Sequence, residues 1–172
     1  DDLCIVAKDL KSIINHLEQD IKYKLKGTGP IDYHLGCNYF RDEHGVLCYA
    51  PKKYIDKLIM DYTKNFGKKP KHYWSPLENN DHPEIDTSKE LDGNGIKIYQ
   101  SMIDSLQWAV SMGRLDISTA VMTLSSFRSS PREGHLTRAK RVFGYLSKFK
   151  NSAIRIRTEQ PDYSKLPNKE FD

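Results

Sequence analysis

The sequence predicts an α+β fold in which a small strand-rich region precedes a mainly helical one. Three observations lead to this prediction: strand-like segments flank an Asp-Glu-His-Gly turn, apolar residues recur at helical spacing in the second half, and residues 68–95 show no period. The chain has 172 residues, 38% of them hydrophobic and 29% charged, as is typical of a soluble globular protein. No apolar run approaches the roughly 18 residues of a membrane span.

Short strands and one helix are expected in the first third. Leu3–Ala7 is apolar and predicts a short buried strand. Residues 10–22 predict an amphipathic helix. Its apolar positions are Leu10, Ile13, Ile14, Leu17 and Ile21. His34–Arg41 and Val46–Ala50 predict a β-hairpin, with Gly45 in the left-handed position of the connecting turn.

A helix over 51–67 follows the hairpin directly. Pro51 suits its first turn, and Gly67 with the nearby Pro70 ends it. The apolar face comprises Tyr54, Ile55, Leu58, Ile59 and Tyr62. Residues 68–95 are rich in proline, glycine, aspartate and asparagine, so we predict a long loop that marks the boundary between two lobes.

Three further helices are expected over 96–157. The first carries the apolar stripe Tyr99, Met102, Ile103, Leu106, Ala109 and Val110. Asp116 can cap the second, whose core face is Ile117, Ala120, Val121 and Leu124. Pro131 separates the third, which turns inward Leu136, Ala139, Val142, Phe143, Leu146 and Phe149. Ala153–Arg157 predicts a final short strand, and 158–172 resembles a linker.

Charge is distributed unevenly behind the formal net value of +4. Basic residues outnumber acidic ones by seven to two in 51–75 and by eight to three in 101–151, whereas 76–100 holds two basic and six acidic residues. Clustered positive charge indicates a polyanionic partner. The alternative is that these charges belong to ordinary solvated helix faces.

Two groups of residues are candidates for function. Asp1 and Asp2 are adjacent carboxylates, the ligands that hard divalent cations prefer and that two-metal phosphoryl transfer employs. The alternative is a charged turn. On the third late helix, one stripe could combine phosphate contacts with base stacking, unless it is a solvated basic face. That stripe is Arg138, Arg141, Tyr145 and Lys148.

The sequence contains no motif for a zinc site, a disulfide scaffold, a serine nucleophile or a phosphate-binding loop. The three cysteines form no Cys-x-x-Cys pair, and the six histidines show no paired helical spacing, so a structural zinc site is not expected. So few cysteines argue for a reducing compartment and against a disulfide scaffold. We find no Gly-x-Ser-x-Gly motif and no phosphate-binding Gly-x-x-x-x-Gly-Lys loop.

Seven short motifs follow one another in the sequence. In chain order they are Asp1-Asp2-Leu3; Leu35-Gly36 with Arg41-Asp42 and Gly45; Tyr54-Ile55-Asp56-Lys57-Leu58; Ser75-Pro76-Leu77; Tyr99 with Ser105-Leu106; Arg114-Leu115-Asp116-Ile117-Ser118-Thr119-Ala120-Val121; and Pro131, His135, Ala139-Lys140-Arg141 and Tyr145-Leu146. In this order they resemble the reverse transcriptase of copia-type LTR retrotransposons, in the part that begins at the Asp-Asp of its Tyr-x-Asp-Asp motif. Leu115 replaces the family's usual proline and Asp104 its frequent glycine, which indicates a divergent branch.

The resemblance implies RNA-directed DNA polymerisation with Mg²⁺, or alternatively Mn²⁺. Asp1 and Asp2 would be catalytic metal ligands. Residues 1–50 would be the end of the polymerase palm, with a primer-grip hairpin that includes Leu35, Gly36, Cys37 and Tyr39. The helix over 51–67 would belong to the thumb, 68–95 would be a loop, and 96–157 would be the helical thumb and connection. Nucleic-acid contacts would come from Lys52, Lys53, Arg138, Arg141, Tyr145 and Lys148.

The same resemblance implies partners and a location. The partners would be an RNA template, a DNA primer, deoxynucleoside triphosphates, and the ribonuclease H and integrase regions of the polyprotein, with 158–172 leading toward ribonuclease H. The location would be intracellular, in a cytoplasmic particle or in the nucleus, with no membrane association. The family's first catalytic aspartate would precede residue 1, so we expect this fragment to be inactive alone. The alternative is a non-catalytic nucleic-acid-binding or assembly module of a decayed retroelement polyprotein.

Overall fold

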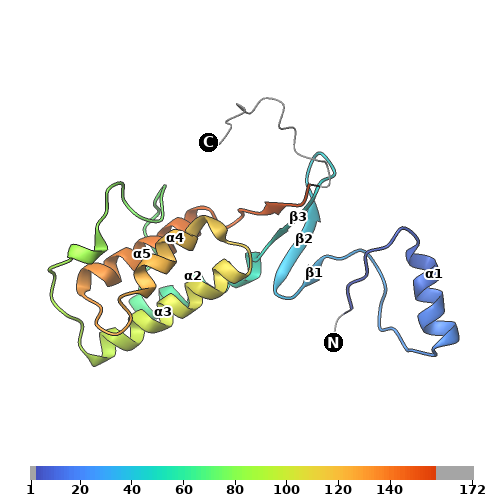
Figure 1. The fold of residues 1–172 in the computed structure, drawn as a ribbon, viewed down its shortest axis with the longest axis horizontal. Helices are drawn as coiled ribbons and strands as arrows, with labels where there is room; N and C mark the ends of the chain where they lie inside the picture. The colour runs from blue at the N-terminus through green and yellow to red at the C-terminus, as the bar shows by residue number, and fades with distance from the viewer. Residues whose placement is uncertain (1–2, 158–172) are drawn as a thin grey trace, which may run out of the picture.

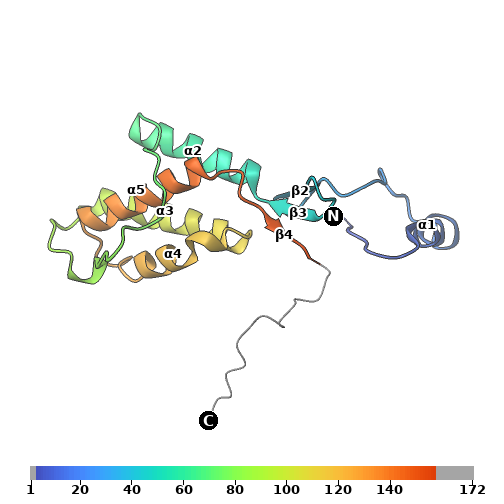
Figure 2. The ribbon, with the colours of Figure 1, turned by 90° about the horizontal axis from the view of Figure 1, so that it is seen from above.

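A computed structural model describes residues 3–157. These residues form five α-helices and a four-stranded antiparallel sheet, which is an α+β arrangement. Helices α2 to α5 gather into a bundle at one end, the sheet lies beside it, and α1 lies beyond the sheet (Figures 1 and 2). Asp1, Asp2 and 158–172 lie outside the described residues, so the expectations for them stay predictions.

The predicted hairpin is confirmed. It consists of β2 (Cys37–Arg41) and β3 (Leu47–Ala50), which pair antiparallel with Arg41 opposite Leu47. In the connecting turn, the Asp42 carboxylate accepts hydrogen bonds from the backbone N–H groups of His44 and Val46 at 2.9 and 3.0 Å. Gly45 has a φ of 75°, the left-handed conformation that the sequence predicted.

The predicted strand His34–Arg41 is interrupted, which corrects the expectation. β1 (Tyr33–His34) ends before Leu35 and pairs back onto β2, with His34 opposite Cys37. Leu35 and Gly36 form the turn between them, with φ values of 47° and 84°. Two positive φ values at the centre of a tight hairpin match the twist of the strands that it joins.

The last strand closes the sheet from far along the chain. β4 (Ile154–Arg155) pairs antiparallel with β3, so that Tyr49 lies opposite Ile154. Arg155 also forms an ion pair with Asp42 at 2.7 Å. The predicted strand over Ala153–Arg157 therefore forms, although it is shorter than expected.

The first described residues differ from the prediction. Leu3–Ala7 is not a buried strand: it has no regular structure, and Leu3 and Val6 are 65% and 95% exposed. A strand needs a hydrogen-bonding neighbour, and none of the strands within 3–157 pairs with this segment. The predicted helix forms as α1 (Leu10–Asn15) and continues as a π-helix to Asp20, but none of its residues is buried.

The bundle contains one apolar core to which all four of its helices contribute. The helices are α2 (Lys52–Phe66), α3 (Gly93–Ser111), α4 (Ser118–Ser125) and α5 (Glu133–Lys148). Core side chains include Ile55, Leu58 and Tyr62 of α2, Ile103 and Leu106 of α3, Val121 and Leu124 of α4, and Val142 and Leu146 of α5. The apolar faces read from the sequence are therefore the faces that are buried.

The loop after α2 does not separate two lobes. The predicted lobe boundary at 68–95 is therefore wrong. The helices on its two sides share the core just described, and the loop lies along α5. A short 3-10 helix, Pro83–Ile85, is held to α5 by the buried His135. His135 Nδ1 accepts a hydrogen bond from the Arg132 N–H at 3.0 Å, so its Nε2–H donates to the Pro83 carbonyl at 2.9 Å.

Two glycines of α5 permit this close approach. A Cβ at Gly134 would collide with the Asp86 carboxylate, and a Cβ at Gly144 would collide with the Lys71 carbonyl oxygen. Glycine in a helix interior costs roughly 1 kcal/mol relative to alanine. Here it creates the space in which the loop backbone docks.

The turn after α3 connects the bundle to the sheet. Gly113 has a φ of 105°, and a Cβ there would lie 3.0 Å from Tyr49 Cε2 and 3.1 Å from Ile154 Cδ1. The preceding Met112 carbonyl accepts a hydrogen bond from the Cys37 thiol at 3.5 Å. The hairpin is thus seated on the end of α3.

Candidate nucleic-acid interface

Leu35 is the exposed tip of the β1–β2 hairpin. Its side chain is 82% exposed, and its backbone is in the left-handed region. That conformation costs a residue with a β-carbon roughly 1–2 kcal/mol, and here no burial offsets the cost. The tight turn with Gly36 imposes this conformation and presents the Leu35 side chain to solvent.

The other three residues predicted for the primer grip lie inward of this tip. Gly36 faces the terminal methyl group of Met112, which a Cβ at this position would displace. Cys37 is buried, and its burial raises the pKa of its thiol. Tyr39 stacks on Tyr49 with 5.8 Å between ring centroids. They therefore support the hairpin, and Leu35 is the one that reaches solvent.

Lys52 and Lys53 are exposed at the start of α2, beside this hairpin. The Lys53 ammonium lies 4.1 Å from the centroid of the Tyr33 ring, within the range of a cation–π contact. Tyr33 is not among the site residues predicted from the sequence. The position of Tyr33 beside Lys53 depends on the turn at Leu35–Gly36, which no local periodicity in the sequence predicts.

A row of lysines runs from this contact along the outer face of α2. Lys53, Lys57 and Lys64 occupy positions i, i+4 and i+11, opposite the buried face, and all three are exposed. Lys97 of α3 lies across a shallow groove from Lys57. The groove is otherwise lined by Tyr54, Leu58, Asp61, Gln100, Ser101, Asp104 and Ser105. We call Lys53, Lys57 and Lys64 the lysine row.

The basic stripe predicted on α5 is not a solvated face. Arg138 forms ion pairs with Asp81, at 2.8 Å, and with Asp86. Arg141 pairs with Glu78 at 2.7 Å and also donates to the Ser75 carbonyl. The two arginine side chains are only 21% and 18% exposed. Their charge is matched within the chain, so the geometry supports a structural role, and a direct phosphate contact stays a prediction.

The remaining members of the stripe lie in different surroundings. Tyr145 is half-buried, and burial together with the nearby Asp116 carboxylate raises its pKa. Lys148 places its ammonium 3.6 Å from the centroid of the Trp74 ring. The structure therefore does not bring the four residues together as one contact surface.

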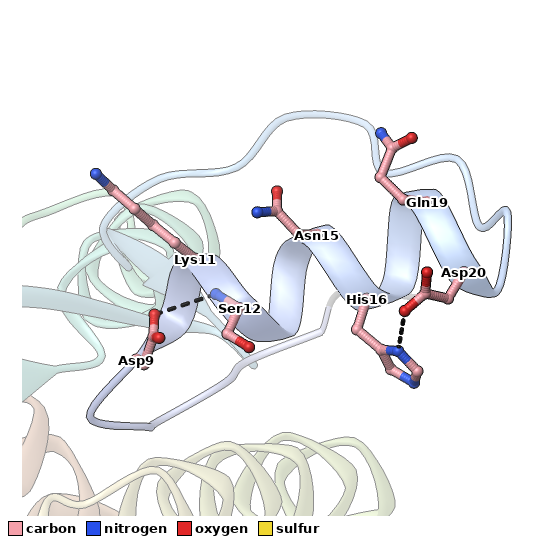
Figure 3. A pocket seen from close by; sticks show the side chains of 7 residues that line it. All are labelled: Asp9, Lys11, Ser12, Asn15, His16, Gln19 and Asp20. Carbon is pink, nitrogen blue, oxygen red and sulfur yellow. Dashed lines mark hydrogen bonds and ion pairs between the residues drawn. The ribbon is translucent and has the colours of Figure 1, made fainter.

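Residues 3–157 provide no candidate metal centre. Within this range no group of three or more His, Cys, Asp or Glu side chains is placed to hold a metal ion. The polar face of α1 illustrates the point (Figure 3). Asp9 caps the helix by accepting from the Ser12 N–H at 3.1 Å, and His16 pairs with Asp20 at 2.7 Å. Lys11, Asn15 and Gln19 project from the opposite side of the helix. The predicted ligands Asp1 and Asp2 lie outside the described residues.

Comparisons with known proteins identify the class of element from which the chain derives. The chain is similar to retrotransposon proteins, which supports an origin in a retroelement polyprotein. It is 31% identical over 160 residues to a transposon Ty5-1 protein of Saccharomyces cerevisiae, covering 92% of this chain and 50% of that protein. It is 30% identical over 155 residues to the retrovirus-related Pol polyprotein from transposon TNT 1-94 of Nicotiana tabacum, covering 85% of this chain and 11% of the polyprotein.

The chain thus spans about half the length of the first relative and a small part of the second. No protein-family model matches it, and no solved structure matches it significantly. As for membranes, none of the helices described for 3–157 has both the length and the apolar character needed to cross one.

Proposed function

We propose that the chain is the C-terminal part of a copia-type reverse transcriptase, comprising the end of the palm and the thumb. The observation that carries the proposal is the exposed, strained tip at Leu35 in a hairpin that leads directly into the lysine row of α2. The homology to retrotransposon polyproteins and the seven ordered motifs support the same conclusion.

Asp1 and Asp2 would hold the divalent cation. Two adjacent carboxylates form the hard oxygen donor set that suits Mg²⁺, and Mn²⁺ accepts the same ligands. The bound ions would supply the positive charge that stabilises the attacking and leaving oxygens during nucleotidyl transfer. This chain would supply one side of the site, and a further aspartate would come from the preceding part of the enzyme.

The hairpin and the lysine row would position the primer and the template. Leu35 would contact the primer end, held in place because Gly36 and Cys37 fix the hairpin to the end of α3. The ammonium groups of the lysine row would follow the phosphates of the RNA–DNA duplex, which positions nucleic acid without reading its sequence. The proposed partners are therefore an RNA template, a DNA primer and deoxynucleoside triphosphates.

The remaining proposals concern the polyprotein. Its ribonuclease H and integrase regions would act with this chain in a cytoplasmic retrotransposon particle or in the nucleus. The alternative function is a non-catalytic nucleic-acid-binding or assembly module, in which the lysine row still binds nucleic acid but Asp1 and Asp2 perform no chemistry.

Duplex binding is tested with the 172-residue chain. The triple variant Lys53→Gln, Lys57→Gln and Lys64→Gln removes the lysine row without touching the core. We expect weaker binding to an RNA–DNA hybrid, and a slope of log K against log salt that is less negative by about 0.9 for each lost phosphate contact. The measurement is fluorescence anisotropy at several salt concentrations.

A matched control carries the same change in net charge. Lys11, Lys24 and Lys26 are exposed lysines outside the bundle, and their triple glutamine variant should leave the slope almost unchanged. Equal slopes for both variants would show that binding depends on net charge and not on the lysine row, which would remove the main support for the proposal.

Catalysis is tested in the parent polyprotein. Asp1→Asn and Asp2→Asn should each abolish primer extension while template–primer binding is retained, because they remove metal-binding charge and not duplex contacts. Asp32→Asn, on an exposed aspartate before β1, is the control. Extension at normal rates in either active-site variant would contradict the assignment. Duplex binding without extension by the unmodified polyprotein would establish the alternative function.

A further inference from the structure

Trp74 is an exposed aromatic side chain that the proposed polymerase role does not use. It is 79% exposed, although it lies in the loop that docks on α5. The Lys148 ammonium lies 3.6 Å from its ring centroid, and Phe149 meets it edge-on at 5.9 Å between ring centroids. The indole is therefore held by its neighbours while most of its surface remains open to solvent.

The loop that carries Trp74 is divided into two parts of opposite charge. The part after Trp74 is acidic, and its Glu78, Asp81 and Asp86 are matched by arginines of α5. The part before it contains Lys68, Lys69 and Lys71, which are exposed and join none of the ion pairs found within 3–157. Because the acidic part is already paired with α5, the lysines that precede Trp74 in the loop remain available to an anion.

We propose that Trp74 and the exposed lysines that precede it in the loop bind single-stranded nucleic acid. The open face of the indole would stack on an unpaired base, and Lys68, Lys69 and Lys71 would contact the adjoining phosphates. Lys148 would hold the ring by its cation–π contact. The proposal rests on the proposed function, and it adds a site for an unpaired strand that is separate from the lysine row on α2.

The surroundings favour a nucleic acid over a membrane surface. Tyr73 and Phe149 are half-buried, and the exposed neighbour His72 lies 3.4 Å from the Ser147 hydroxyl. One exposed indole among polar groups is too small an apolar area for stable membrane insertion. It is, however, sufficient to stack on one base.

The two tryptophans of the chain permit a direct test. Trp108 on α3 is 59% exposed and serves as the matched control. Trp108→Phe leaves Trp74 as the sole tryptophan reporter, and Trp74→Phe leaves Trp108. We expect a single-stranded poly(U) or oligo(dT) probe to quench the fluorescence of the Trp108→Phe variant and to leave that of the Trp74→Phe variant unchanged. Equal quenching in both, or none in the first, would overturn the proposal.

Affinity provides the second measurement. Trp74→Ala should weaken single-strand binding about tenfold, as expected for the loss of one stacked base, whereas Trp108→Ala should leave it unchanged. Circular dichroism checks that both variants are folded. If vesicles containing phosphatidylserine quench Trp74 and the single-stranded probes do not, the surface binds membranes and the proposal is wrong.

The same variants separate this proposal from the proposed function. Trp74→Ala should not change the affinity for an RNA–DNA hybrid, since the lysine row is intact. If Trp74 does not respond to single strands while hybrid binding still depends on the lysine row, this proposal alone fails. If hybrid binding does not depend on the lysine row, the proposed function fails, whatever Trp74 does.

Discussion

The guanidinium of Arg114 donates two parallel hydrogen bonds to the carboxylate of Asp116, at 2.9 and 2.7 Å. The Arg114 side chain is only 1% exposed, so its charge depends on this partner. Burial is the largest single influence and acts to raise the pKa of Asp116, but the hydrogen bonds and charge of Arg114, together with a hydrogen bond from Tyr145, lower that pKa overall. The pair stabilises the corner between α3 and α4, immediately after the turn that seats the hairpin.

The pairing also corrects the sequence analysis, which assigned Asp116 to the N-cap of α4. That cap position is occupied by Ile117, whose side chain makes no capping hydrogen bond. Asp116 lies within the 3-10 helix Leu115–Ile117. Its carboxylate is used for Arg114, because a buried guanidinium without an anion would cost more than an uncapped helix end.

Asp116→Ala should lower the free energy of unfolding by about 3 kcal/mol, because it leaves the buried guanidinium without its anion. The measurement is urea unfolding followed by circular dichroism. Asp104→Ala is the matched control, since it breaks the pair with Arg128 in which the carboxylate is 60% exposed, and we expect a loss below about 1 kcal/mol. Similar losses in the two variants would contradict the role assigned to Asp116.

Docking of the loop on α5 should weaken in acid. A hydrogen bond from Ser88 lowers the pKa of Asp86 from 3.8 to about 2, burial opposes this shift, and Arg138 adds to it. Because the folded-state pKa is depressed, the stabilisation is complete above pH 3.8 and is lost as pH falls toward 2. Amide hydrogen exchange of 75–90 should accelerate over this range, relative to that of α3.

Asp86→Asn is the control for this pH dependence. The variant should exchange faster at neutral pH and should lose most of the acceleration in acid, since the titrating group is absent. An unchanged pH profile in Asp86→Asn would show that another group controls docking of the loop.

Gly144→Ala should displace the start of the loop. The added Cβ would collide with the Lys71 carbonyl, which is backbone and cannot rotate away. We expect a loss of roughly 1–3 kcal/mol, typical of overpacking, even though alanine favours the helix. The measurement is thermal unfolding with limited proteolysis of 68–80. Gly29→Ala has open space around the new methyl group and should change neither result.

The cysteines should differ in reactivity. Cys4 is exposed, whereas Cys37 and Cys48 are buried, and burial raises the pKa of the Cys37 thiol. A thiol-reactive dye should therefore label Cys4 rapidly in the folded protein and all three cysteines in denaturant. Cys4→Ser should remove the rapid phase. Rapid labelling of Cys37 in the folded protein would contradict the seating of the hairpin on α3.

The elements predicted correctly are those whose signals are local. The hairpin around Gly45 follows from two strand-like segments joined by a turn with glycine, and the faces of α2, α3 and α5 follow from a period of three to four residues. The strand at Leu3–Ala7 was wrong because apolar composition alone does not supply a pairing partner. The primer-grip and metal-ligand assignments stay predictions.

The α5 stripe shows why the candidate site could be predicted only in part. Helical spacing correctly placed Arg138 and Arg141 near one another, but their acidic partners lie 57 and 63 residues earlier. The acidic composition of 76–100 was a usable signal, since it matches the arginines that follow it. The clustered basic charge of 101–151, considered without these acidic partners, indicated either an external polyanion or a solvated helix face. Because Arg138 pairs with Asp81 and Asp86, Arg138→Gln should affect the stability of the fold before it affects binding.

The pairing of β3 with β4 also defines how the bundle is attached. Tyr49 and Ile154 are neighbours across one antiparallel ladder, so the chain leaves the sheet after β3 and returns to the adjacent strand. In topological terms, the whole bundle is the end loop of a β-hairpin, with its entry and exit about one strand spacing, roughly 5 Å, apart. A short turn joining β3 directly to β4 would leave the strand order unchanged. The bundle is thus an insertion whose two chain connections to the sheet are a single pair of adjacent strands.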